Sequence, residues 1–235
     1  ARLLVRGRFE GALRLGLTAP YEFDRGPQKK EKAVLRDGWG DWQGLKDRLP
    51  RGHARSLVDY LRVHPGDFRG AVARLRPELR GLYLSAYQSH LWNRMLARWL
   101  TEHLPPERLR PVTLRLGAAP FHAGLDPARQ AELAALQLPL PSARLKLAPD
   151  DPRAGVVHAV LAEEGLGLPD LQIRGVREMF FSKGERAALC LPAQLTQEAA
   201  PDELHPKRSK LTLSFELPRG CYATLLVKAA TSAPE

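Results

Sequence analysis

The sequence predicts an α+β protein that is mostly helical over about its first 104 residues and mixes helix with strand after them. Three observations lead to this prediction. Apolar residues recur at helical spacing as far as Leu104, with short connections between the stripes. Pro105-Pro106 then interrupts the chain. Beyond it, segments with alternating apolar residues appear, and the clearest is 210–217, where Leu211, Leu213, Phe215 and Leu217 share one face.

The stretch 82–100 predicts the central helix. It contains neither Pro nor Gly, and Pro77 suits the first turn of a helix that includes it. Its apolar stripe is wide enough for a largely buried helix: Leu84, Tyr87, Leu91, Met95 and Trp99, widened by Trp92, Leu96 and Leu100. Four polar residues need hydrogen-bond partners if they are buried: Ser85, Gln88, Ser89 and Asn93. The simplest interpretation is that they bond neighbouring loops and fix the packing.

The other helices before residue 105 follow from apolar spacing and from breakers. Residues 1–20 predict one helix, whose apolar stripe is Leu3, Leu4, Phe9, Leu13 and Leu17. Residues 21–30 predict a polar connection. The range 32–49 predicts a helix with a break at 38–40, and 55–63 predicts another. Asp67 can cap the next helix.

After residue 105 the predicted elements are shorter. The sequence favours strands at 112–116, 177–181, 187–191 and 210–217, helices at 126–136, 156–164 and 221–228, and a chain break at 138–141. Pro218-Arg219-Gly220 predicts a turn between the last strand and the last helix.

The charge balance favours a polyanionic partner. Thirty-six basic against 26 acidic residues give a formal net charge of +10. Nucleic acid is the simplest partner for such a chain. A basic but inert surface is the alternative.

Motifs for cofactors and metals are missing from the sequence. It has no Gly-rich phosphate loop, no dinucleotide fingerprint and no Gly-x-Ser-x-Gly elbow. Two cysteines, Cys190 and Cys221, make neither a disulfide framework nor a zinc site. The histidines lack metal-ligand spacing: His53, His64, His90, His103, His122, His158 and His205. No metal ligands and no cofactor are therefore predicted.

The sequence shows no apolar run long enough for a membrane span and no signal peptide, so we expect a cytoplasmic, reducing location and no membrane partner. The chain starts with Ala inside a predicted helix, from which we expect the polypeptide to begin further upstream.

Two motifs resemble a known family. Leu84-Ser85-Ala86-Tyr87-Gln88-Ser89-His90-Leu91-Trp92-Asn93 is similar to the central helix signature of the TruD family of tRNA pseudouridine synthases. The segment 215–224, Phe-Glu-Leu-Pro-Arg-Gly-Cys-Tyr-Ala-Thr, resembles the closing motif of that family, and 186–195 is a weaker third match. The three follow the family order, and the resemblance covers essentially the whole chain.

The resemblance implies isomerisation of a specific uridine to pseudouridine in RNA, with tRNA as the expected partner. In that family a uridine leaves its stack. An aspartate carboxylate attacks, and the base is detached, rotated and rejoined through carbon without a metal or organic cofactor. The implied domains are 1–185, a mostly helical TRUD-type insertion, and 186–235, the closing strand-rich piece of the catalytic domain.

The resemblance transfers one substrate-binding residue, Tyr222, where the family places an aromatic ring against the target base. Core packing with a bonded hydroxyl is the alternative role for Tyr222. No catalytic residue is assigned. Gly44-Leu45-Lys46-Asp47 matches the family's Gly-x-Lys-Asp nucleophile motif, but 49–52 does not continue it and the context predicts a helix end. We therefore expect this chain alone to be inactive.

Two other functions stay open on the sequence. The first is a basic RNA-binding module without catalysis. The second is a helical DNA-binding regulator, which is disfavoured because no helix-turn-helix pair is recognisable.

Overall fold

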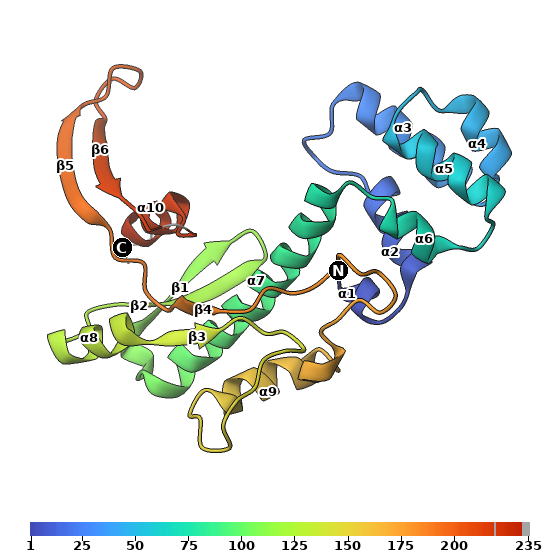
Figure 1. Ribbon diagram of the computed structural model, residues 1–235. Coiled ribbons are helices and arrows are strands. Elements are labelled where there is room, and N and C mark those ends of the chain that lie inside the picture. The colour runs from blue at the N-terminus through green and yellow to red at the C-terminus, as the bar shows by residue number, and fades with distance from the viewer. Residues whose placement is uncertain (219, 232–235) are drawn as a thin grey trace. The chain divides into compact units, whose positions relative to one another are not determined.

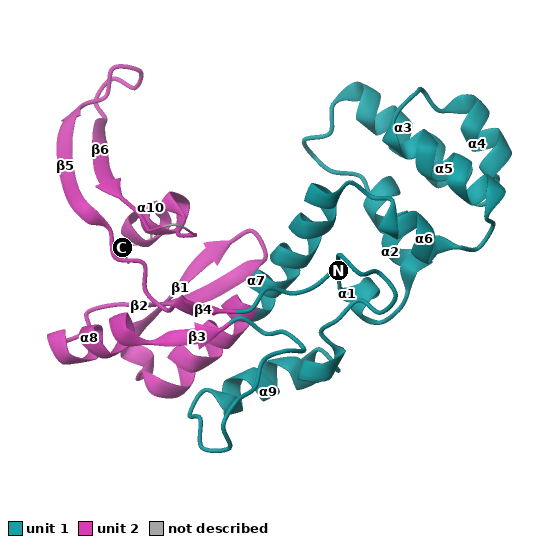
Figure 2. Cartoon of the chain, in the orientation of Figure 1, with its two compact units in different colours: residues 1–91, 140–183 teal, residues 92–139, 184–235 magenta. Residues whose placement is uncertain are grey.

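The computed structural model describes residues 1–218 and 220–231, and the chain forms two compact units. Unit 1 comprises residues 1–91 and 140–183, and unit 2 comprises residues 92–139 and 184–235 (Figure 2). Helices dominate unit 1, whereas unit 2 holds the strands (Figure 1). The expected α+β class is thereby confirmed. These units differ from the predicted family domains 1–185 and 186–235, and that division stays a prediction.

Unit 1 begins with six short helices and the first half of a long one. Their bounds are α1 (Arg2–Val5), α2 (Phe9–Thr18), α3 (Gly26–Asp37), α4 (Trp42–Arg48), α5 (His53–Val63), α6 (Phe68–Ala73) and α7 (Pro77–His103). One of its buried clusters gathers side chains of α3, α4 and α5 with their connections: Leu35, Leu45, Leu49, Ala54 and Val58. The returning segment adds α9 (Ala154–Glu163) and the 3-10 turn η2 (Leu168–Asp170).

The helix predicted over 1–20 is wrong, because the chain forms two helices there. Gly7 adopts a left-handed φ of +70°. The amides of Gly7 and Arg8 donate to the carbonyls of Leu4 and Leu3, which is a glycine-based helix end. The expected polar connection is also shorter than 21–30, since α3 already begins at Gly26.

Several boundaries agree with their sequence signals. Helix α7 begins at Pro77. The Asp67 carboxylate accepts from the amide of Gly70, 2.8 Å away, and caps α6. Gly165, with a φ of +64°, ends α9.

Unit 2 contains three two-stranded antiparallel sheets among its described residues. The pairs are β1 (Leu109–Leu114) with β2 (Gly117–His122), β3 (Gln137–Pro139) with β4 (Glu185–Ala187), and β5 (Ala193–Pro201) with β6 (Ser209–Glu216). The helical elements are the second half of α7, the turn η1 (Pro106–Arg108), α8 (Pro127–Ala135) and α10 (Ala223–Thr231).

The strand predicted at 177–181 is wrong. The amide of Met179 closes a turn onto Val176. The carbonyl of Phe181 accepts from Arg144 at 3.0 Å, and that of the following Ser182 accepts from Gln88 at 2.8 Å. Side chains thus supply the hydrogen bonds that a neighbouring strand would provide. The strand predicted at 187–191 is displaced to β4, and the expected break at 138–141 includes the short strand β3.

Strand β6 confirms the prediction at 210–217, but its apolar face is not a core face in this chain. Leu211 is 57% exposed, and Leu213, Phe215 and Leu217 are half-buried. A two-stranded hairpin has no second layer of its own, so it covers each side chain only partly.

The central helix is buried as expected. Leu84, Leu91 and Met95 are at most 4% exposed, while Tyr87 and Trp99 are half-buried. Of its polar residues, Gln88 turns inward and bonds two backbone carbonyls, whereas Ser85 and Asn93 face solvent. The packing interpretation is therefore confirmed for Gln88.

Candidate functional site

The segment around Tyr222 follows β6 through a tight turn. Arg219 of the predicted turn lies outside the described residues. Beside it, the amide of Cys221 donates to the carbonyl of Pro218 at 3.1 Å, and Gly220 has a φ of +92°, a value that favours glycine. Tyr222 comes directly before α10 and is 63% exposed. Its ring is accessible in this chain, and neither concavity described below includes it.

Helix α10 is fixed to β1 by two cationic side chains. The ammonium of Lys228 donates to the carbonyl of Thr113 at 2.9 Å. The guanidinium of Arg110 donates to the carbonyl of Ala229 near the helix end. Cations near a helix C-terminus also interact favourably with its dipole. These bonds give the residue before the helix, Tyr222, a defined position in unit 2.

The two cysteines interact with each other, and Cys221 directly precedes Tyr222 in the sequence. Burial is the main cause that raises the pKa of the Cys190 thiol to about 11, and a hydrogen bond and the charge of the neighbouring Cys221 thiol contribute to the same rise. Both cysteines are free and half-buried. A thiol with so high a pKa is a poor nucleophile near neutral pH. Cys190 is therefore a packing residue rather than a reactive one.

Several apolar side chains in the segment from β4 to the end of α10 are exposed. Those that are 39–63% exposed between β4 and the end of α10 are Leu191, Leu195, Leu211, Tyr222, Leu225 and Val227. Among its described residues, α10 has no buried side chain. Apolar surface of this extent is typical of a face that contacts another layer of protein.

Asp47 has the surroundings that its sequence context predicts. It lies on α4, and its side chain faces solvent. The amide nitrogen of Gln43, one turn earlier, donates to both carboxylate oxygens at 3.0 and 3.2 Å. No strand precedes Asp47 in the part of the chain that the structure describes. Asp47 is therefore an unsuitable nucleophile.

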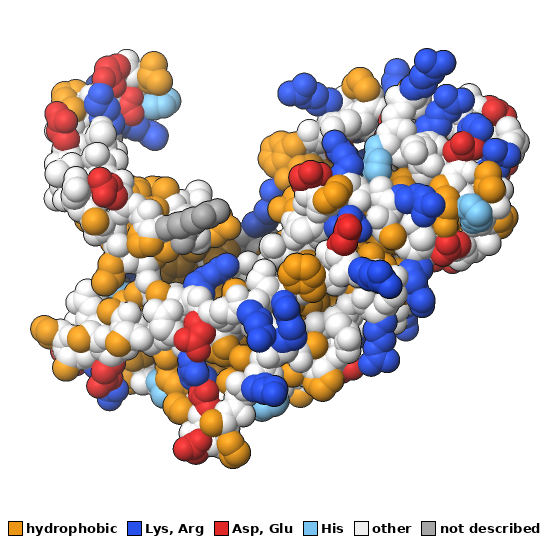
Figure 3. Space-filling model, in the orientation of Figure 1, with side chains coloured by type: hydrophobic (Ala, Val, Ile, Leu, Met, Phe, Trp, Pro, Cys, Tyr) orange, Lys and Arg blue, Asp and Glu red, His pale blue; other side chains and the backbone are white. Residues whose placement is uncertain are grey.

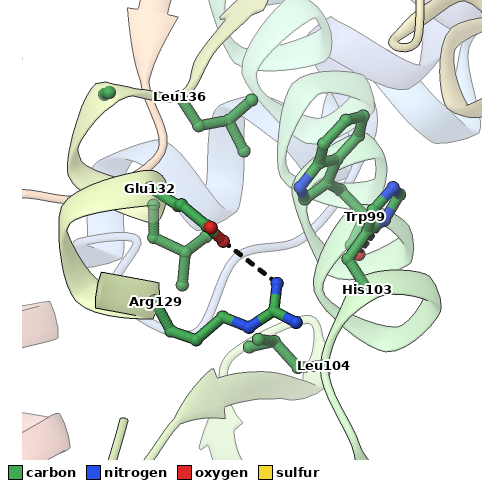
Figure 4. A pocket seen from close by; sticks show the side chains of 8 residues that line it. Trp99, His103, Leu104, Arg129, Glu132 and Leu136 are labelled. Carbon is green, nitrogen blue, oxygen red and sulfur yellow. Dashed lines mark hydrogen bonds and ion pairs between the residues drawn. The ribbon is translucent and has the colours of Figure 1, made fainter. Parts of the chain in front are cut away.

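A pocket of about 280 Å³ lies between α7 and α8 (Figure 4). The rings of Trp99 and His103 stack along α7 with centroids 3.9 Å apart. Nδ1 of His103 donates to the carbonyl of Trp99 at 2.9 Å. On α8, Arg129 and Glu132 form an ion pair at 3.0 Å. Since Arg129 and Glu132 neutralise each other and Leu104, Leu133 and Leu136 complete much of the lining, this pocket offers a largely apolar surface rather than a reactive centre.

A second, more open concavity of about 620 Å³ lies in unit 1 at the start of α2. The guanidinium of Arg69 lies 5.1 Å from the ring centroid of Phe9. Arg8 and Arg69 share this lining with Glu10 and Asp67, so its formal charges balance.

Basic residues concentrate in unit 1. Its residues include 24 of the 36 basic and 16 of the 26 acidic side chains, giving a formal charge of +8 against +2 for unit 2. Figure 3 shows Lys and Arg side chains spread over the helices of unit 1. Both units contribute basic residues that could contact phosphates, among them Arg6, Arg8, Lys29 and Lys30 in unit 1, and Lys207, Arg208 and Lys210 in unit 2.

Metal and membrane features are not found. Among the described residues, no three His, Cys, Asp or Glu side chains lie close enough to hold a metal ion. Within the same ranges, no helix combines the length and apolar character that a membrane span needs.

Comparison with known proteins gives the family. The model of the family described as tRNA pseudouridine synthase D (TruD) matches residues 1–112 and 122–229. The chain belongs to the TruD family. The match includes the central helix signature and the closing motif with Tyr222.

Individual TruD proteins agree with this assignment. A tRNA pseudouridine synthase D of Aquifex aeolicus is 28% identical over 97% of the chain, and a Methanococcus maripaludis relative named "Probable tRNA pseudouridine synthase D 1" is 26% identical over 97%. A crystal structure of a Methanosarcina mazei protein assigned to TruD superposes with a TM-score of 0.73 at 25% identity over 99% of the chain. The chain spans only 55%, 59% and 56% of these proteins, respectively.

Proposed function

We propose that this chain is part of an enzyme that converts a specific uridine of tRNA to pseudouridine. The observation that carries the proposal is the TruD match over 1–112 and 122–229. The basic surface of unit 1 supports it, because tRNA is a polyanion whose phosphates attract Lys and Arg. The proposed location is the cytoplasm, where tRNA is available, and no cofactor is proposed.

Residues 186–235 are proposed to close the catalytic domain, and residues 1–185 to form the inserted domain. The exposed apolar side chains of β5, β6 and α10 support the first assignment, because a further layer of protein would cover them. In that domain the ring of Tyr222 would stack on the target uracil. The 63% exposure of Tyr222 favours this role over core packing in the present chain.

The 235-residue chain by itself is proposed to be inactive. The solvated position of Asp47 on α4 supports this, since the only match to the nucleophile motif is then unsuitable. A carboxylate nucleophile would have to come from elsewhere in a complete TruD protein.

The test compares the complete gene product with the 235-residue chain on tRNA transcripts, with pseudouridine measured by mass spectrometry. Turnover is expected from the gene product and not from the chain alone. A gene product that never converts uridine would overturn the enzyme assignment. Turnover by the chain alone, lost in Asp47→Ala, would overturn the proposed inactivity.

A further inference from the structure

We infer that the loop between α2 and α3 binds an unpaired RNA base, which stacks on Phe23 and Tyr21 while adjacent cations hold its phosphates. The inference rests on the proposed function in one respect, namely that RNA is the partner. The sequence pattern alone had assigned this segment, 21–30, only to a polar connection.

The two rings are presented to solvent together. Phe23 is 69% exposed and Tyr21 is 47% exposed. Their centroids lie 5.3 Å apart with an interplanar angle of 69°, so one ring supports the edge of the other. The exposed face of such a pair has the size and polarisable character that a nucleobase needs for stacking.

Hydrogen bonds within the loop fix its shape. The Asp24 carboxylate accepts from the amide of Tyr21 at 2.9 Å, and the Asp24 amide donates to the Tyr21 carbonyl at 3.0 Å. Lys32 of α3 donates to both carboxylate oxygens of Asp24 at 2.7 and 2.9 Å. The hydrogen bond from Lys32 is also the main cause that lowers the pKa of Asp24. The charged Asp24 side chain is thus 8% exposed while the apolar rings beside it face water.

Three cations follow the rings closely in the sequence. Arg25, Lys29 and Lys30 are exposed, and within the ranges that the structure describes none of them forms an ion pair. Glu22 and Glu31 lie in the same stretch, so the attraction is moderate rather than extreme. Figure 3 shows hydrophobic side chains at this loop with Lys and Arg side chains near them. This combination fits a phosphate backbone with a splayed base better than it fits an apolar protein surface.

The two rings also predict whether the bound RNA is single-stranded or a duplex. Bases inside a duplex are stacked on each other and present only their edges, so the rings cannot reach their faces. The loop should therefore favour single strands and the unpaired loops of tRNA over a duplex.

The experiment measures binding of the 235-residue chain to three labelled probes by fluorescence anisotropy: a tRNA transcript, a 12-nucleotide single strand, and its duplex. Phe23→Ala should weaken binding to tRNA and the single strand about 5- to 100-fold, as expected for one lost stacking contact. Binding to the duplex should not change. Phe23→Trp should restore affinity, whereas Phe23→Leu should not, because Leu keeps apolar bulk without an aromatic face.

Two controls separate stacking from other effects. Leu82→Ala removes a side chain of the same unit that is 62% exposed, and it should leave binding unchanged. The melting temperature of each Phe23 variant should equal that of the original chain, because the ring is mostly in water. Lys29→Gln with Lys30→Gln should lower the slope of log affinity against log salt, which Phe23→Ala should leave unaltered.

The outcomes distinguish the two proposals. If the original chain binds tRNA and Phe23→Ala binds it equally, the loop inference is wrong and the proposed function stands. If Phe23→Leu binds as the original chain does, the rings make an apolar contact and the stacking inference is wrong. If the original chain binds none of the probes, both the inference and its RNA partner are overturned.

Discussion

At the scale of single residues, the structure shows which side chains serve packing and which face outward. Tyr87 of the family signature donates to Glu164 at 3.2 Å, and burial, followed by the charge of Glu164, raises the pKa of Tyr87 to about 12. Gln88 is equally occupied with backbone carbonyls. Tyr222 and Phe23 are instead exposed. Position in a family motif therefore does not by itself determine whether a side chain is buried or exposed.

Cys190 should be alkylated slowly. Its thiol, with a pKa of about 11, is ionised in about one molecule per thousand at pH 8. Iodoacetamide at that pH should therefore modify Cys190 about tenfold more slowly than a free thiol, because the greater nucleophilicity of a high-pKa thiolate offsets part of the loss. Cys221→Ala should speed the reaction, but not to the free rate, because burial is the larger cause. Mass spectrometry of the modified peptide measures this, and equal rates for Cys190 and free cysteine would contradict it.

Arg80 carries a buried charge whose pairing can be tested. Its side chain is 8% exposed, it pairs with Glu178, and its Nε has no hydrogen-bond partner. Glu178→Ala should lower the free energy of unfolding by about 1–2 kcal/mol, because the guanidinium loses its partner and Glu178 is itself mostly solvated. Arg80→Met should lower the free energy of unfolding by less, because it removes the buried charge and with it the penalty for taking that charge out of water. Urea titrations compare the two, and a greater loss in Arg80→Met would contradict this account.

At the scale of elements, local sequence signals predicted the positions of those helices that depend on local interactions. Proline, an aspartate cap and apolar spacing located α7, α6 and α8. The misplaced strands near 177–191 depend on distant partners: β4 forms because β3, nearly 50 residues earlier, pairs with it in the register Gln137↔Ala187. Strand β5 has no alternating apolar pattern and forms through its pairing with β6.

Gln88 connects helix α7 to both ends of the segment 140–183 of unit 1. The Gln88 side-chain amide donates to the carbonyls of Pro141 and Ser182 at 3.0 and 2.8 Å, and the residue is 4% exposed. Gln88→Ala should lower the free energy of unfolding by about 2–4 kcal/mol, because two carbonyls lose their donor and a cavity forms. Ser85→Ala, on the solvent side of the same helix, should change it by less than about 0.5 kcal/mol. Similar urea midpoints for the two variants would show that Gln88 does not connect these segments.

At the scale of the whole molecule, the charge could be counted from the sequence but its distribution could not. Residues far apart in the chain assemble each unit, and only the structure shows that unit 1 carries +8 of the net +10. Family motifs likewise predicted TruD membership, which the comparison confirms. The exposed pair Tyr21 and Phe23 escaped sequence reasoning because two aromatic residues in a polar stretch give no periodic signal.

Binding of tRNA by the 235-residue chain should weaken steeply with salt. Release of counterions from about four phosphates predicts a slope near −3 for log affinity against log salt. Removing two charges from unit 1, by Lys29→Gln with Lys30→Gln, should reduce the slope more than Lys207→Gln with Arg208→Gln in unit 2. Anisotropy titrations between low and physiological salt measure both. A slope near zero would rule out a phosphate-binding surface.

Single-turnover pseudouridine formation by the complete gene product on one tRNA tests the central claim most directly. Tyr222→Phe should keep its rate, because stacking uses the ring and not the hydroxyl. Tyr222→Ala should lose roughly tenfold or more in rate with a melting temperature close to that of the original protein, since the ring is exposed in this chain. If Tyr222→Ala instead melts several degrees lower and keeps its full rate, Tyr222 is a core residue and does not contact the target base.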